Sequence, residues 1–170
     1  MNAFTPRLDI LPLPQRNLWP ELASVPRRFV LYGGTAIALR LGHRSSVDFD
    51  FFTSAPFSPA DLWREMALLE QAQPVRSEPN TLTVSLHRGG PVKLSFFGGL
   101  RLGRVGEPER TDDGVLVAAS LLDLAGTKAA VIQQRAECRD YLDIAAWPYL
   151  TLLAALTLVC FGLSYVVFMR

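Results

Sequence analysis

The sequence has few cysteines, few charged residues and almost no net charge. Its two cysteines, Cys138 and Cys160, have neither metal-ligand spacing nor the pattern of a short secreted disulfide framework. We therefore expect a reducing, cytoplasmic compartment. A net charge of +1 gives no global attraction to nucleic acid. No cleaved secretory signal is expected, because Asp9, Pro12 and Pro14 interrupt the N-terminal apolar residues.

The most informative stretch is the one that ends in two closely spaced aspartates. It begins with the apolar run Phe29–Tyr32, continues through Gly33-Gly34 into the helix-forming segment Thr35–Leu41, and ends in an apolar run that carries Asp48 and Asp50. This order predicts a strand, a tight turn, a helix and a second strand. Side chains alternate between the faces of a strand, so both aspartates are expected on one face, with their apolar neighbours on the other.

This arrangement suggests a metal and a phosphate. Two carboxylates about 7 Å apart on one strand face repel each other unless a cation lies between them. Oxygen ligands of this kind suit Mg²⁺ or Mn²⁺. Gly33-Gly34 offers unencumbered N–H groups at a helix N-terminus, where a phosphate is favoured, and Thr35 adds a hydroxyl. Taken singly, each half has a plainer interpretation, namely an ordinary turn and a solvated acidic face balanced by Arg44.

The two halves together resemble a known signature. An apolar strand, Gly-Gly and then Asp-apolar-Asp-apolar are typical of the nucleotidyltransferase, or polymerase-beta-like, superfamily. The fuller string GGTAIAL, followed by Arg44-x-Ser46-x-Asp48-Phe49-Asp50-Phe51-Phe52, resembles the AbiEii-type nucleotidyltransferase toxins of bacterial abortive-infection and toxin–antitoxin systems. A second block, DLAGTK at 123–128 with Arg135 and RDYLD at 139–143, supports this likeness. The resemblance covers about Leu13 to Ala146.

The resemblance implies a metal-dependent transfer of a nucleoside monophosphate from an NTP to a hydroxyl, with tRNA as the acceptor and an antitoxin protein as partner. Its implied Mg²⁺ or Mn²⁺ ligands are Asp48 and Asp50. Its implied nucleotide-binding residues are Gly33, Gly34, Thr35, Arg44, Ser46 and Lys128, with Arg44 and Ser46 bracing the loop before the acids. Lys128 would neutralise the triphosphate, and Asp140 would serve as an additional acid or as the general base.

The sequence departs from the superfamily pattern at one place. A third carboxylate is expected on a following strand, but the strand at 92–97 reads VKLSFF and contains no acid. Either Lys93 or Ser95 occupies the expected place. A site with two carboxylates binds a divalent ion more weakly, so a bound triphosphate would have to complete the coordination.

A capping box, Ser120 with Asp123, predicts the start of a long helix. On one continuous helix, Lys128, Arg135 and Arg139 would fall within about 40° of one another, with Asp143 close by. From spacing alone, the preferred interpretation of this stripe is solvated ion pairs, such as Arg139 with Asp143 at i,i+4. The resemblance instead favours an active-site role for Lys128 and Asp140.

The remaining elements predict an α/β (α+β) domain with a mixed, mainly antiparallel sheet of four or five strands backed by helices. We expect helices over Pro14–Ala23 and from Ser58, as N-cap, to about Gln73. Strands at Thr81–His87 and Val92–Phe97 form a hairpin. A short strand at 115–117 is also expected.

The C-terminal end differs in character from the rest, which predicts a nucleotidyltransferase-like domain at 1–146 and an apolar segment at 147–170. Residues 149–169 contain no charge and, as a helix, would extend about 31 Å. Three interpretations stay open: a membrane tail anchor, a buried helix, or an altered or truncated end of the gene.

Two other functions stay open beside the nucleotidyltransferase. The missing third acid and the C-terminal segment motivate a catalytically impaired nucleotide-binding module. The Asp-x-Asp pattern is also found in glycosyltransferases that hold a nucleotide sugar through a metal.

Overall fold

The computed structural model describes residues 3–99, 103–134 and 137–147. In these ranges the strands are β1 (Ala3–Phe4), β2 (Val30–Tyr32), β3 (Asp48–Phe52), β4 (Gln73–Glu78), β5 (Thr81–His87), β6 (Pro91–Phe97), β7 (Glu109–Thr111) and β8 (Val117–Ala118). The α-helices are α1 (Leu13–Leu18), α2 (Gly33–Leu41), α3 (Pro59–Glu65), α4 (Leu121–Gln134) and α5 (Cys138–Ala145). The 3-10 helices are η1 (Leu8–Ile10), η2 (Trp19–Ser24) and η3 (Ala67–Gln71).

The chain divides into two compact units, Met1–Thr127 and Lys128–Arg170, and the whole sheet belongs to the first. The division expected at residue 147 lies next to residues 148–170, which are outside the described residues, so it stays a prediction. The apolar segment 149–169 lies outside them as well. Within the described ranges, no helix has the length and apolar character needed to cross a membrane.

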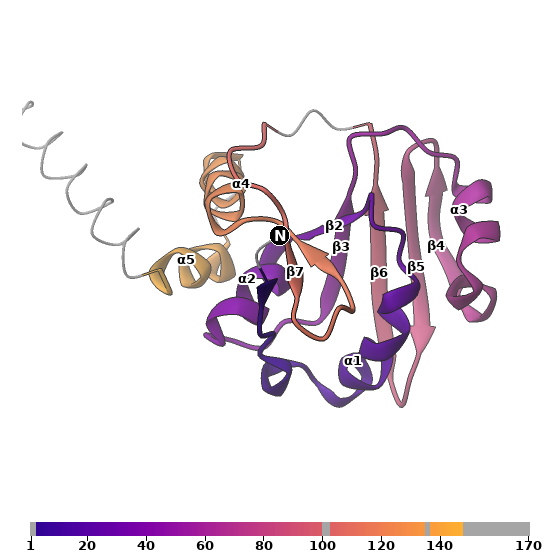
Figure 1. The fold of residues 1–170 in the computed structure, drawn as a ribbon, viewed down its shortest axis with the longest axis horizontal. Helices are drawn as coiled ribbons and strands as arrows, with labels where there is room; N and C mark the ends of the chain where they lie inside the picture. Colours follow the sequence, from indigo (N-terminus) through magenta and orange to yellow (C-terminus); the bar gives the residue numbers. More distant parts are fainter. Residues whose placement is uncertain (1–2, 100–102, 135–136, 148–170) are drawn as a thin grey trace, which may run out of the picture. The chain divides into compact units, whose positions relative to one another are not determined.

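The strands of the first unit form one mixed sheet in the order β1-β7-β8-β2-β3-β6-β5-β4. The antiparallel pairs are β2–β3, β4–β5, β5–β6 and β7–β8, and the parallel pairs are β1–β7, β2–β8 and β3–β6. Figure 1 shows β3, β6, β5 and β4 side by side. The predicted α/β class and mainly antiparallel sheet are confirmed. The expected four or five strands were too few, because the described residues contribute eight.

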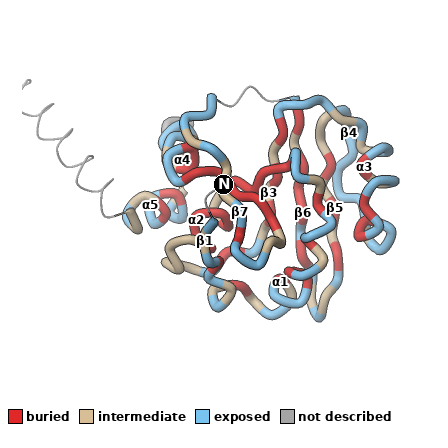
Figure 2. The backbone as a smooth tube through the Cα atoms, viewed as in Figure 1, coloured by how far each residue is buried: buried red, intermediate tan, exposed pale blue. Residues whose placement is uncertain are grey.

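The core lies against one face of the central strands. Alternation along β3, β6 and β5 buries Phe49 and Phe51, Leu94 and Phe96, and their apolar counterparts on β5. Phe96 stacks on Phe51 and meets Phe29 edge to face, with ring centroids 5.3 Å apart in each pair. Figure 2 shows buried segments that alternate with intermediate ones along β5 and with exposed ones in the first half of β6, whereas β4 is exposed throughout. The opposite face is therefore left to polar side chains.

Two expected helices of the first unit are interrupted. The helix over Pro14–Ala23 is α1 followed by η2, with Pro20 in the first turn of η2. The helix that was expected to reach Gln73 ends at Glu65, and Met66 is extended before η3 begins. On a continuous helix Met66 and Leu68 would point about 200° apart. Both are buried, and the break at Met66 makes this possible. Ser58 is the N-cap of α3, but it makes no side-chain capping bond.

The predicted long helix after Ser120 is also wrong in its second half. Ser120 caps α4 as expected, because its hydroxyl oxygen accepts the backbone N–H of Asp123 at 3.1 Å. However, α4 ends at Gln134, Glu137 is extended, and α5 follows as a separate helix. Arg139 therefore does not share one continuous helix with Lys128, and it forms an ion pair of 2.6 Å with Glu137. Arg135 lies outside the described residues.

Candidate functional site

The glycine turn between β2 and α2 lies directly against Asp50. Gly33 has φ +75°, in the left-handed region that favours glycine. A Cβ atom at Gly33 would lie 3.3 Å from Oδ2 of Asp50. The Asp50 carboxylate therefore lies over the first residue of α2, near the backbone N–H groups at the helix N-terminus. A phosphate at the same end would meet the negative charge of Asp50, so the two are compatible only with a cation between them.

Asp48 and Asp50 project from the same face of β3, as the alternation predicted. Both are half-buried, whereas Phe49 between them is fully buried. The antiparallel pairing of β2 with β3 matches Tyr32 with Asp50, so Asp48 extends beyond the last residue of β2. The two carboxylates thus differ in setting. Asp50 lies beside the glycine turn, and Asp48 lies at the open end of the strand.

The parallel pairing of β3 with β6 shows which residues stand where a third acid was expected. Ser95 stands opposite Asp50, and Lys93 stands opposite Asp48. Ser95 is buried, whereas the Lys93 ammonium lies 3.3 Å from Oδ2 of Asp48 as a half-exposed ion pair. In the described part of the chain, no group of three or more His, Cys, Asp or Glu side chains is placed to hold a metal ion. The protein therefore offers two carboxylates, with a lysine beside one of them.

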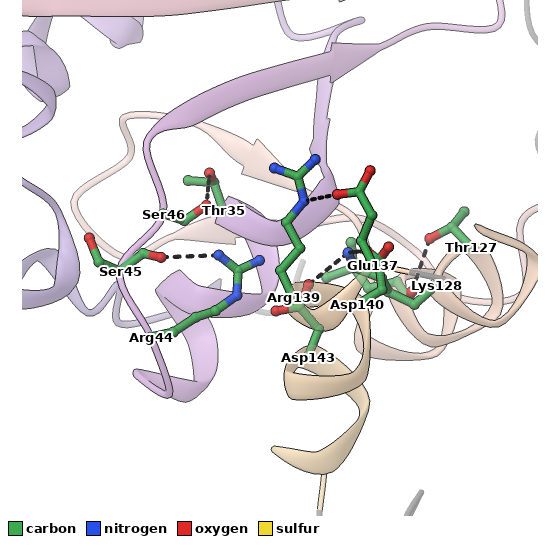
Figure 3. Close-up of polar contacts among 11 residues, drawn as sticks. Thr35, Arg44, Ser45, Ser46, Thr127, Lys128, Glu137, Arg139, Asp140 and Asp143 are labelled. Carbon is green, nitrogen blue, oxygen red and sulfur yellow. Dashed lines mark hydrogen bonds and ion pairs between the residues drawn. The ribbon is translucent and has the colours of Figure 1, made fainter. Parts of the chain in front are cut away.

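Thr35 and Ser46 join the first turn of α2 to the start of β3. Their hydroxyls share a hydrogen bond of 2.7 Å, and the Thr35 hydroxyl donates to the backbone carbonyl of Asp48. Figure 3 shows the Thr35 and Ser46 side chains facing each other. Arg44 donates to the carbonyl of Ser45 at 3.0 Å in the intervening loop. These contacts fix the backbone next to Asp48, and the predicted nucleotide-binding roles of the three residues stay predictions.

Tyr32 precedes the glycine turn and packs edge-on against Phe52, with ring centroids 5.3 Å apart. Burial raises the pKa of its hydroxyl, and the charge of Asp123 raises that pKa further, whereas Arg104 lowers it. The net shift is upward, so the hydroxyl is neutral near pH 7 and can donate or accept a hydrogen bond beside the turn.

The second unit contains a buried ion cluster made by Lys128, Asp140 and Asp143. The Lys128 ammonium lies 2.6 Å from Oδ1 of Asp140 and 2.7 Å from Oδ2 of Asp143. Both carboxylates are completely buried, and the lysine is nearly so. Figure 3 shows Lys128 directed at Asp140. On one continuous helix, 12 and 15 residues would separate these groups by about 18–22 Å. The break between α4 and α5 is what brings them together.

Sequence reasoning missed Gln15 as a residue near the acids. Gln15 on α1 is 4% exposed, and its amide Nε2 donates to the carbonyl of Val47, the residue before Asp48, at 3.0 Å. Its place in the sequence indicated only a helix start. No local signal could have found this contact, because it depends on how α1 packs beside β6 and the start of β3.

Comparisons with known proteins identify the family of the chain. The family model described as "Nucleotidyl transferase AbiEii toxin, Type IV TA system" matches residues 21–147. A curated protein of Aquifex aeolicus (strain VF5), "Uncharacterized protein aq_aa25", is 36% identical over 118 residues, which are 68% of this chain and 55% of that protein. The chain thus spans about half the length of this relative. No solved structure matches the chain. From residue 21 to residue 147, the chain belongs to the AbiEii nucleotidyltransferase toxin family of Type IV toxin–antitoxin systems.

Proposed function

We propose that the chain carries out metal-dependent nucleotidyl transfer, moving a nucleoside monophosphate from an NTP to a hydroxyl of tRNA in the cytoplasm. A cognate antitoxin protein would oppose this activity. The observation that carries the proposal is the position of the Asp50 carboxylate against Gly33, with Asp48 on the same strand face. The two carboxylates would then hold a metal ion near a helix N-terminus that suits a phosphate.

The donor set fits Mg²⁺ or Mn²⁺ if the substrate helps to hold the ion. Asp48 and Asp50 supply hard carboxylate oxygens, which both ions prefer. Ser95 and Lys93 add no carboxylate from β6, so triphosphate oxygens and water would complete the coordination. When bound, such an ion stabilises the negative charge that develops on the transferred phosphoryl group.

The residues of the chain would then have separate roles in the transfer. The N–H groups at Gly33 and Gly34 would bind phosphate oxygens, while Thr35 and Ser46 hold Asp48 in place through its backbone. Following the family resemblance, Lys128 would neutralise the triphosphate, and Asp140 would serve either as an additional acid or as the general base on the attacking hydroxyl. Because Lys128 is held by Asp140 and Asp143, substrate binding would have to exchange one of these ion pairs for a phosphate contact.

Ser95 favours a second candidate, a nucleotide-binding module with impaired catalysis. A neutral side chain opposite Asp50 leaves the metal with fewer protein ligands than three carboxylates would supply. A glycosyltransferase that uses its Asp-x-Asp pair to hold a nucleotide sugar is the third candidate.

One incubation separates the three functions. The protein is mixed with Mg²⁺, total tRNA and each NTP labelled at its α-phosphate, and in parallel with labelled nucleotide sugars. Label on tRNA supports nucleotidyl transfer, NTP binding without transfer supports the binding module, and transfer from nucleotide sugars alone supports the third candidate. Asp48→Asn and Asp50→Asn should abolish the label, whereas Asp61→Asn, at an exposed aspartate of α3, should not. Full transfer by Asp48→Asn would refute its metal role.

A further inference from the structure

A cavity of about 290 Å³ lies beside Asp48, on the polar face of the sheet. We call it the Asp48 cavity. Its lining residues are Gln15, Val47, Asp48, Val75, Ser85, Pro91 and Lys93. Three of them, Asp48, Lys93 and Ser85, are successive register partners across β3, β6 and β5. The cavity therefore runs outward from one of the two proposed metal ligands toward the exposed edge strand β4.

The cavity and the glycine turn lie at different places along β3. Gly33 lies against Asp50, in the row that Ser95 continues on β6. The cavity lies along the neighbouring row, beginning at Asp48, beyond the end of β2. Asp48 is thus shared between the metal site and the cavity, whereas Asp50 faces the turn where the triphosphate is proposed to bind. A second substrate in the cavity would approach the metal from the Asp48 side.

The walls combine three kinds of chemistry. Val47 and Val75 are exposed apolar side chains, with relative exposures of 48% and 64%, and they flank the opening with Pro91. Gln15 contributes a buried amide whose Oε1 has no hydrogen-bond partner in the described part of the chain. Apolar surfaces suit the face of a base, and the Ser85 hydroxyl and the Gln15 amide suit polar groups at its edge.

The charged residues of the cavity lining are Lys93 and Asp48, which form an ion pair. Lys93 supplies an ammonium at the border with Asp48, where a phosphodiester would follow the last nucleotide of a strand. The volume lies at the small end of ligand pockets, which are typically about 300–1,000 Å³. It suits a single nucleotide unit better than a whole nucleoside triphosphate.

We propose that the Asp48 cavity binds the 3′-terminal nucleotide of the RNA acceptor, with its terminal hydroxyl directed at Asp48. This rests on the proposed nucleotidyl transfer. The hydroxyl oxygen forms a bond to the α-phosphorus of the NTP, the bond from that phosphorus to the oxygen bridging the α- and β-phosphates breaks, and pyrophosphate leaves. The hydroxyl proton is released to water. The attacking and leaving oxygens then lie on opposite sides of the transferred phosphorus, as in-line displacement requires.

Filling the cavity tests this assignment. Ser85→Tyr places a ring in the cavity, and Val75→Trp narrows its opening from an exposed position that tolerates a large side chain. Ser77→Tyr is the matched control, since Ser77 is exposed on β4 and does not line the cavity. The assays are transfer to total tRNA, the Kd of a non-hydrolysable NTP with Mg²⁺, and thermal unfolding to verify folding.

We expect each cavity variant to raise the KM for tRNA by about tenfold, equivalent to ~1.4 kcal/mol, while the Kd for NTP stays within about twofold. The control should change neither. An increase in the NTP Kd would overturn the assignment, because the cavity would then belong to the donor. Unchanged kinetics in both folded cavity variants, or transfer to a protein hydroxyl in place of tRNA, would overturn it as well. A wild-type protein that transfers nothing refutes the proposed function itself, and the assignment falls with it.

Discussion

Replacing Gly33 with alanine should damage the site more than the fold. Its φ of +75° is unfavourable for any residue with a Cβ atom, at a cost of about 1–2 kcal/mol. The new methyl group would also lie 3.3 Å from Oδ2 of Asp50, closer than a carbon and an oxygen normally pack, so the carboxylate must move by a few tenths of an ångström. A misplacement of ~1 Å can cost about 100-fold in rate, so we expect a loss on the order of tenfold in transfer.

Gly114→Ala is the matched control. Gly114 has φ +74°, and a Cβ atom there would only touch the Arg110 guanidinium at 3.4 Å, an ordinary contact. Urea unfolding should show the same loss of about 1–2 kcal/mol for both variants, since the backbone cost is shared. Label transfer from NTP to tRNA should fall only in Gly33→Ala. Equal transfer rates in the two folded variants would refute the reasoning that Asp50 acts from its position over the turn.

Three further predictions concern stability and metal affinity. Arg88 donates two hydrogen bonds to Glu21 and lowers the pKa of its carboxyl, so Glu21→Gln should cost about 1 kcal/mol at pH 7. This difference between variant and wild type should shrink as the pH falls below about 4, where the glutamate is protonated, and urea titrations at several pH values would show it. Lys128→Met leaves two buried carboxylates without their shared ammonium, so thermal unfolding should show a loss of about 3–5 kcal/mol that Lys128→Arg reduces. An unchanged midpoint would contradict the buried cluster. Ser95→Asp places a third carboxylate opposite Asp50. The added charge should lower the unfolding midpoint in the presence of a chelator, and Mn²⁺ bound by the three carboxylates should raise it. An unfolding midpoint that does not respond to Mn²⁺ would contradict the register.

The local features of the site were predictable from the sequence because they depend on near neighbours. Alternation along β3 places Asp48 and Asp50 on one face, and the glycine at Gly33 fits a backbone that other residues avoid. Ser120 and Asp123 form their cap three residues apart. Each of these depends on a few residues in a row, where backbone geometry leaves little choice.

The features that the sequence did not reveal depend on distant pairing. β1 pairs Ala3 with Arg110, and no pattern of two residues could predict such a strand. β4 has no apolar alternation because all of its residues are exposed. Lys93 meets Asp48 only through the parallel register of β3 and β6. These contacts are settled by tertiary packing, which overrides weak local preferences.

The buried cluster in the second unit was obscured for a different reason. Helical periodicity predicted Lys128 and Arg139 on one face of a continuous helix, but the helix is interrupted between α4 and α5. Asp140 and Asp143, three residues apart on α5, then face Lys128 together. A helix break of this kind leaves the apolar periodicity on either side intact, so periodicity alone does not reveal it.

Binding of Mn²⁺ in the presence of a non-hydrolysable NTP tests the central claim most directly. Electron paramagnetic resonance would report the bound ion in the wild type, in Asp48→Asn and in Asp50→Asn, with Asp61→Asn as the control. We predict that the wild type and the control bind the ion with the nucleotide and that both other variants lose it. Undiminished binding in Asp48→Asn and Asp50→Asn would show that these carboxylates do not hold the metal.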